Sequence, residues 1–135
     1  MRGSQEAAKM QPYVGSLEMD TLQNMDFRRV LFTGAREQLV VMALPPGEQI
    51  GREIHDGVDQ FFRIEEGIAR FEFGPGEEKI ARAGDAVLVP AGTFHNVVNA
   101  SSTKTLRLYT IYSPPQHPNG TIQHTRADAL AAAHH

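Results

Sequence analysis

The chain has 135 residues, of which 41% are hydrophobic and 21% charged, with a formal net charge of −3. This size suits one domain with its own core and is too short for two. The absence of cysteine excludes disulfides, thiolate metal sites and cysteine nucleophiles. Because there is no basic run and no apolar stretch of membrane-spanning length, the sequence predicts no nucleic-acid partner, no membrane partner and a cytoplasmic location.

Residues 1–26 show little periodicity, which predicts an N-terminal arm or an extra strand. Their basic start is not followed by the apolar stretch of a secretory signal. The MRGS opening and the Ala-rich, His-ended finish resemble expression tags, so we assign no role to His134 and His135.

From Phe27 onward, short runs of β-branched, aromatic and aliphatic residues alternate with Gly, Pro and Asp, as in an all-β sandwich or barrel. The predicted strands are 27–32, 38–43, 49–55, 60–65, 68–73, 78–82, 86–89 with 95–99, and 104–112. We therefore expect one barrel over residues 27–113. Alternating phenylalanines at positions 62, 71 and 73 are expected in its core.

The C-terminal tail, residues 114–135, follows this barrel. Its Pro- and Gly-rich first part, 114–124, carries His117 and His124 and is expected to be a solvated loop, the alternative being a segment folded over the barrel mouth. Residues 126–133 predict a short C-terminal helix.

Strand alternation brings a set of polar side chains together. Residues i and i+2 of a strand share a face, so Glu53 and His55 project to the same side. The same parity places Gln60 on one face with apolar neighbours. A tight turn over 90–94 can return the chain and deliver the imidazole of His95. Four nitrogen and oxygen donors are thus predicted to meet in one pocket.

On these residues the sequence resembles the cupin superfamily. The second cupin motif, G-x5-P-x-G-x2-H-x3-N, is met in full by Gly84, Pro90, Gly92, His95 and Asn99. The first motif, G-x5-H-x-H-x4-E-x6-G, fits in spacing with Gly47, Glu53, His55, Gln60 and Gly67. Two letters depart from it, since Glu53 stands where histidine is usual and Gln60 where glutamate is usual.

The resemblance implies an all-β double-stranded β-helix, or jelly-roll barrel, around one divalent metal, Fe, Mn, Ni or Zn. Its implied ligands are Glu53, His55, Gln60 and His95. Two imidazoles, one amide and one carboxylate keep the ligand charge of the usual three imidazoles and one carboxylate. The alternative is a metal-free polar pocket in which Glu53, Gln60 and His55 hydrogen-bond one another.

The resemblance leaves the function open. Segments 53–67 and 108–115 look like small single-domain cupins of the mannose-6-phosphate isomerase-like group. We expect a metal-dependent enzyme on a small polar metabolite, which either isomerises a sugar, with Glu53 as the catalytic base, or oxidises a small acid or diol with O₂. A non-catalytic module that binds a small ligand is the alternative, and a structural barrel acting through its dimer interface is a third interpretation.

Other residues have simpler predicted roles. Asn99, like Gly84 and Gly92, is expected to shape turns and strand ends. Tyr109 and Tyr112 lie on opposite faces of the last strand, so one of them lines the pocket. Because small barrels expose strand edges, we also predict a homodimer that pairs through residues 27–43.

Overall fold

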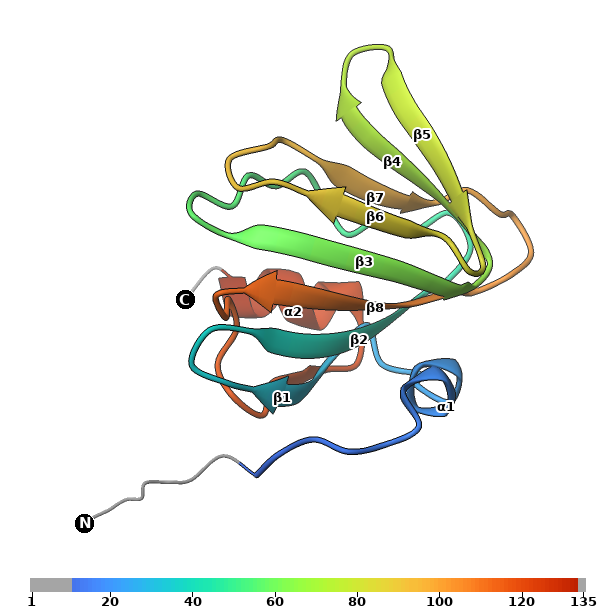
Figure 1. Cartoon of the computed structure of the whole chain (residues 1–135). Coiled ribbons are helices and arrows are strands. Elements are labelled where there is room, and N and C mark those ends of the chain that lie inside the picture. Colours follow the sequence, from blue (N-terminus) through green and yellow to red (C-terminus); the bar gives the residue numbers. More distant parts are fainter. Residues whose placement is uncertain (1–10, 134–135) are drawn as a thin grey trace.

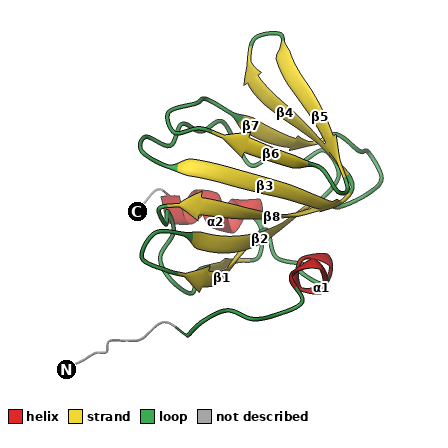
Figure 2. Cartoon of the chain, viewed as in Figure 1, coloured by secondary structure: helices red, strands yellow, loops and turns green. Residues whose placement is uncertain are grey.

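The computed structural model describes residues 11–133, in which two antiparallel sheets enclose one core (Figure 1). One sheet has six strands in the order β6-β3-β8-β2-β1-β9, and the other has three in the order β5-β4-β7. The strands are β1 Arg28–Thr33, β2 Gln38–Leu44, β3 Asp59–Glu66, β4 Ile68–Gly74, β5 Glu77–Arg82, β6 Ala86–Val89, β7 Asn96–Asn99, β8 Leu106–Ser113 and β9 Ile122–Gln123. Helices α1, Leu17–Leu22, and α2, Arg126–Ala133, lie outside the sheets (Figure 2).

Most of the predicted strands are confirmed to within a residue or two, and the exception is segment 49–55. This segment forms no regular strand. Two isolated bridges join it to the β7 region: Gln49 pairs with Val98 of β7, and Glu53 pairs with His95, the residue just before β7. Gly51, at a φ of +125°, interrupts its extended backbone. The prediction joined 86–89 with 95–99, but these strands belong to different sheets.

The core lies between the two sheets and confirms the inward positions predicted from alternation. Phe62 on β3 and Phe71 on β4 are fully buried, and their rings meet edge to face with centroids 5.1 Å apart. Phe73 is half-buried and stacks on Phe71. Aromatic pairs of this kind add to the burial energy that joins the sheets.

Within the described part of the N-terminal segment, residues 17–22 form the short helix α1 and no extra strand forms among residues 11–26, while residues 1–10 lie outside the described residues. Helix α1 packs against β2, β3 and β8. The Thr21 hydroxyl donates to the Leu17 carbonyl, and the Tyr13 hydroxyl donates to Asp20 at 2.6 Å. These local contacts stabilise a helix too short to persist alone.

The C-terminal tail packs on the barrel, so the solvated-loop prediction is wrong for the part around His117. The buried Gln38 amide donates to the His117 carbonyl at 2.7 Å, and its oxygen accepts from the His117 N–H at 3.0 Å. Farther on, β9 pairs with β1, and the C-terminal helix is confirmed as α2. His124 is exposed, although its ring bonds Asp26 at 2.7 Å. His134 and His135 lie outside the described residues.

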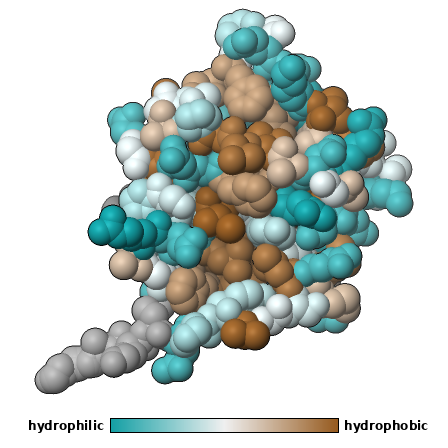
Figure 3. Space-filling view, in the orientation of Figure 1, coloured by the Kyte–Doolittle hydropathy of each residue, from teal (hydrophilic) through white to brown (hydrophobic). Residues whose placement is uncertain are grey.

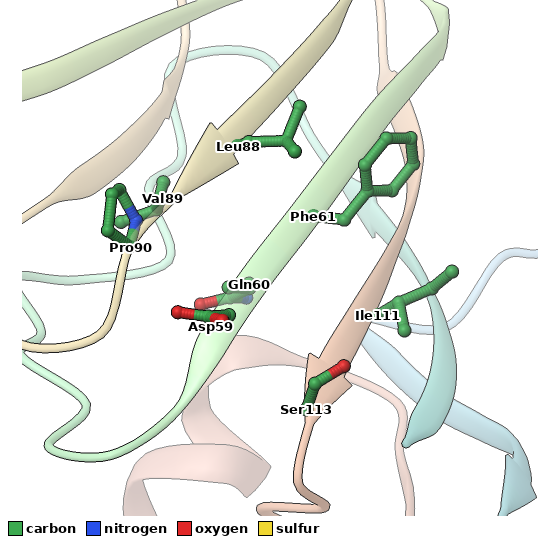
Figure 4. Close-up of a pocket in the computed structure, with 8 residues that line it drawn as sticks. All are labelled: Asp59, Gln60, Phe61, Leu88, Val89, Pro90, Ile111 and Ser113. Atoms are coloured by element: carbon green, nitrogen blue, oxygen red, sulfur yellow. The ribbon is translucent and has the colours of Figure 1, made fainter. Parts of the chain in front are cut away.

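The surface of the six-stranded sheet bears on the predicted homodimer. β9 pairs with Arg28 and Arg29 at the start of β1, so the chain itself occupies this part of the edge predicted to pair between copies. The face in view in Figure 3 carries an apolar patch instead. Leu88, Phe61 and Ile111 lie opposite one another on β6, β3 and β8, around a shallow hollow (Figure 4), and Leu88 is 72% exposed. The homodimer stays a prediction.

No helix of the described part of the chain has the length and apolar character needed to cross a membrane.

Candidate metal centre

The bridge between Glu53 and His95 brings the two cupin motifs together. Each backbone N–H donates to the other residue's carbonyl at 2.9 Å. Directly opposed residues of an antiparallel pair send their side chains to one face, and His55 joins that face two residues after Glu53. The ligand atoms of Glu53, His55 and His95 consequently lie within 4.8 Å of one another.

Hydrogen bonds from the turn over 90–94 hold the backbone at His55 and at the start of β3. Gly92, at a φ of +80°, donates its N–H to the His55 carbonyl at 3.0 Å. The preceding Ala91 N–H donates to an Asp59 carboxylate oxygen at 2.9 Å, which ties the turn to the start of β3. A side chain at position 92 would strain this positive φ, so the glycine of the second motif has the structural role predicted for it.

The His95 imidazole is oriented as a ligand. It is 2% exposed, and its Nδ1 lies 3.0 Å from the Thr93 carbonyl. Because a carbonyl only accepts, Nδ1 carries the proton and Nε2 keeps a free lone pair. Nε2 is buried and has no hydrogen-bond partner among residues 11–133. A histidine whose second nitrogen donates to a carbonyl in this way is the usual state of a metal ligand.

Gln60 presents a second unpaired acceptor. The side chain is 4% exposed, and its amide nitrogen donates to the Thr110 hydroxyl at 3.0 Å. Its Oε1 is buried without a partner in the described part of the chain. Gln60 shares a face of β3 with Phe62, whose ring centroid is 6.1 Å from that of His95. An unsatisfied buried acceptor costs about 1–3 kcal/mol, which a bound cation would offset.

Glu53 and His55 are already paired. Glu53 Oε1 lies 3.1 Å from His55 Nε2, as the metal-free alternative expects, whereas Gln60 bonds Thr110 instead of joining them. Burial raises the pKa of Glu53, but the hydrogen bond and charge of His55 and the charge of Arg28 outweigh it and hold that pKa below its usual value. The carboxylate is therefore ionised at neutral pH and available to a cation.

This donor set fits a divalent metal. The two imidazoles and the carboxylate, whose ligand atoms lie within 4.8 Å of one another, suit Fe, Mn, Ni or Zn. Beside them, the buried His95 Nε2 and Gln60 Oε1 have no hydrogen-bond partner among residues 11–133. Glu53, His55 and His95 would thus hold such an ion between them.

Comparisons with known proteins agree with this geometry. The cupin domain family model matches residues 40–112, more than half of the chain. The chain belongs to the cupin family. It is 45% identical to the uncharacterized protein YrkC of Bacillus subtilis, over 90% of this chain and 67% of that protein. The uncharacterized protein L612 of Acanthamoeba polyphaga mimivirus is 44% identical, over 83% of this chain and 71% of its own length.

The similarity extends to a solved structure. BH2720 from Bacillus halodurans is 43% identical to this cupin, with a TM-score of 0.86 over 90% of this chain and 95% of that one. The all-β jelly-roll class predicted from the two motifs is therefore confirmed.

The cupin's last long strand settles which tyrosine faces the pocket. Tyr112 is buried with its ring edge-on to His55, at 5.8 Å between centroids, while Tyr109 lies on the other face beside Phe61. Burial raises the pKa of Tyr112 to about 12, so its hydroxyl stays protonated. His117 Nε2 lies 3.3 Å from that hydroxyl, and burial together with the Arg28 charge lowers the His117 pKa to about 4.

A cavity of about 450 Å³ opens beside Glu53, the one candidate ligand among its lining residues. It lies between β1, the segment that carries Glu53 and the C-terminal tail, and Arg28 and His117 line it. Sequence reasoning missed Arg28, and for His117 it favoured a solvated loop over a segment folded across the barrel mouth. Arg28 and Arg29 are adjacent, so alternation alone does not say which of them faces inward, and His117 reaches the cavity only because the tail folds back.

Proposed function

We propose that this cupin is a metal-dependent enzyme acting on a small polar metabolite, and that one divalent metal is held by Glu53, His55, Gln60 and His95. The observation that carries the proposal is the His95 imidazole, whose Nε2 is buried and unpartnered within residues 11–133 while its Nδ1 is fixed on the Thr93 carbonyl. That nitrogen faces the ligand atoms of Glu53 and His55 within 4.8 Å.

Gln60 is the proposed fourth ligand. Its amide nitrogen is held by Thr110, which leaves Oε1 as the atom free to coordinate. The metal-free alternative expects the Gln60 amide to hydrogen-bond Glu53. In the structure the amide nitrogen instead donates to the Thr110 hydroxyl. A bound cation would give a partner to both buried acceptors, His95 Nε2 and Gln60 Oε1.

Of the two reaction types, oxidation of a small acid or diol with O₂ is the better supported. Isomerisation needs a separate base, and Glu53, the carboxylate that lines the cavity, belongs to the ligand group. A bound metal supplies Lewis acidity and, if it is iron, one-electron chemistry. If both atoms of O₂ enter the product, no external reductant is needed. The likeness to mannose-6-phosphate isomerase-like cupins stays a prediction.

A non-catalytic binding module is the second candidate. It is favoured by His117, which lines the cavity, and by Tyr112, whose hydroxyl lies 3.3 Å from His117 Nε2. Their pKa values, about 4 for His117 and about 12 for Tyr112, are far from those that suit proton transfer at neutral pH. Oxygen uptake by iron-loaded protein on a panel of small acids and diols distinguishes the two, since a binding module consumes none.

Metal content tests the ligand set. Elemental analysis by inductively coupled plasma mass spectrometry, on protein without tags and without added metal, should find near-stoichiometric Fe, Mn, Ni or Zn. His55→Ala and His95→Ala should each lose at least about tenfold in metal affinity, and Gln60→Glu should keep or tighten it. His124→Ala is the matched control, because this histidine is exposed and outside the site.

Parent protein that stays empty after soaking in these metals would reject the metal centre. If His55→Ala, His95→Ala and Gln60→Glu all hold metal like the parent, the metal lies elsewhere and the ligand assignment is wrong.

A further inference from the structure

A buried arginine stands beside the candidate metal centre. Arg28 is 6% exposed and faces the interior with Val30, while the adjacent Arg29 points outward. Its Nη1 donates to the Gln123 side-chain oxygen at 2.8 Å, and its guanidinium carbon lies 5.2 Å from the centre of the Phe27 ring. Its Nε is buried and has no hydrogen-bond partner in the described chain.

These contacts leave the charge of Arg28 poorly compensated. A guanidinium carries five N–H donors, and the contact to Gln123 is with a neutral amide. Burying a cation is costly unless an anion pairs with it. Glu53 lines the same cavity, but its Oε1 is engaged with His55, and no ion pair joins Glu53 to Arg28 among the described residues. An external anion would supply the missing partner.

The charge and the lining of the cavity suit such a ligand. Two arginines, Arg28 and Arg126, line it against one carboxylate, Glu53, and a divalent ion at the metal centre would add to this positive excess. Its other walls are largely apolar. They include Phe27, Ile50, Pro118, Ala129 and Leu130.

We propose that Arg28 forms an anion subsite, and that the ligand of this cupin carries a carboxylate attached to an apolar group. The inference rests on the proposed function, because it names the substrate class of the same site. A planar guanidinium matches a carboxylate through paired hydrogen bonds. The second arginine of this wall, Arg126, donates its Nε to the Ile50 carbonyl at 3.4 Å, so the fork of Arg28 is the group proposed for the carboxylate, and phosphate is tested as the competing anion.

The test compares charged and neutral probes by isothermal titration calorimetry at low salt. Benzoate and acetate are paired with benzamide and acetamide, and phosphate is a further probe. The parent should bind at least one carboxylate about tenfold more tightly than its amide. Arg28→Gln should remove that preference. Arg29→Gln is the matched control and should keep it, because Arg29 is half exposed on the opposite face.

Arg28→Lys covers the case in which Arg28→Gln does not fold. It keeps the charge but loses the planar fork, so it should bind the preferred carboxylate several-fold more weakly than the parent. Parent-like carboxylate binding by either variant would overturn the subsite. So would a parent that prefers phosphate, or one that binds no carboxylate above its amide.

Metal content, measured on the same samples, separates the two proposals. Arg28→Gln should retain metal, since Arg28 is not one of the ligands. A parent that holds no metal but binds carboxylate through Arg28 would reject the metal-dependent function and support the subsite. A parent that holds metal without Arg28-dependent binding would reject the subsite alone.

Discussion

Strand β2 and segment 49–55 follow each other closely in the chain but differ in nearly every physical respect. All of β2 is buried, and its backbone pairs with β1 on one side and β8 on the other. Segment 49–55 has two isolated bridges and alternates between exposed and half-buried residues. The paired strand stabilises the barrel, and the loosely paired segment holds Glu53 and His55. Substitutions in β2 are therefore expected to lower the free energy of unfolding more than substitutions of exposed residues in segment 49–55.

Side-chain hydrogen bonds replace the missing sheet pairing of this segment. The Asn96 oxygen accepts from the Gly51 N–H at 2.9 Å, and its amide nitrogen donates to the Gln49 side chain at 2.7 Å. A buried asparagine on β7 thus holds the segment next to the bridge that positions the ligands. This gives Glu53 and His55 fixed positions without a continuous ladder.

The largest effect on stability is expected in β2. Met42→Ala deletes a fully buried core side chain and should lower the free energy of unfolding by about 2–5 kcal/mol, measured by urea denaturation. Ile54→Ala is the matched control in the other region, where the side chain is 55% exposed, and should change it by less than about 0.5 kcal/mol. Comparable losses in the two variants would mean that the segments are not energetically distinct.

An intermediate effect is expected where the chain leaves β2. The Asn99 amide donates to the carbonyls of Leu44, Pro45 and Lys104 at 2.8–3.1 Å. Asn99→Ala leaves these carbonyls without that donor and should cost about 1–3 kcal/mol in the same assay. Thr103→Ala, at an exposed position of the same turn, should be nearly neutral. An unchanged midpoint for Asn99→Ala would show that water replaces the amide fully.

The smallest effect is expected in the tail. The hydrogen bond and charge of Asp26 raise the pKa of His124 above 6.5. The stabilisation from this pair is therefore complete below the unfolded pKa of 6.5 and is lost as the pH rises through the folded value. An NMR titration of the His124 ring should find the raised pKa, and Asp26→Asn should return it to its ordinary value. A parent ring that titrates at the ordinary value would contradict the contact.

Much of the barrel could be predicted because its signals are local. Alternation places Phe62 and Phe71 in the core, and turn residues mark the strand ends almost everywhere. The spacing of the two motifs also groups Glu53 and His55 with His95, since strand parity and one tight turn are enough to bring them to one pocket. Coordination by Gln60 stays a prediction.

The surroundings of that group depend on contacts between residues far apart in the sequence. Gln38 meets His117 across 79 positions of sequence, and Arg28 meets Gln123 across 95, so no local pattern signals either contact. The failure of segment 49–55 as a strand has the same cause, because a strand needs a partner along its length and the pattern of one segment does not specify one. Local signals in the chain thus specify the barrel and the grouping of Glu53, His55 and His95, whereas long-range packing brings the tail against a cavity that a buried arginine lines.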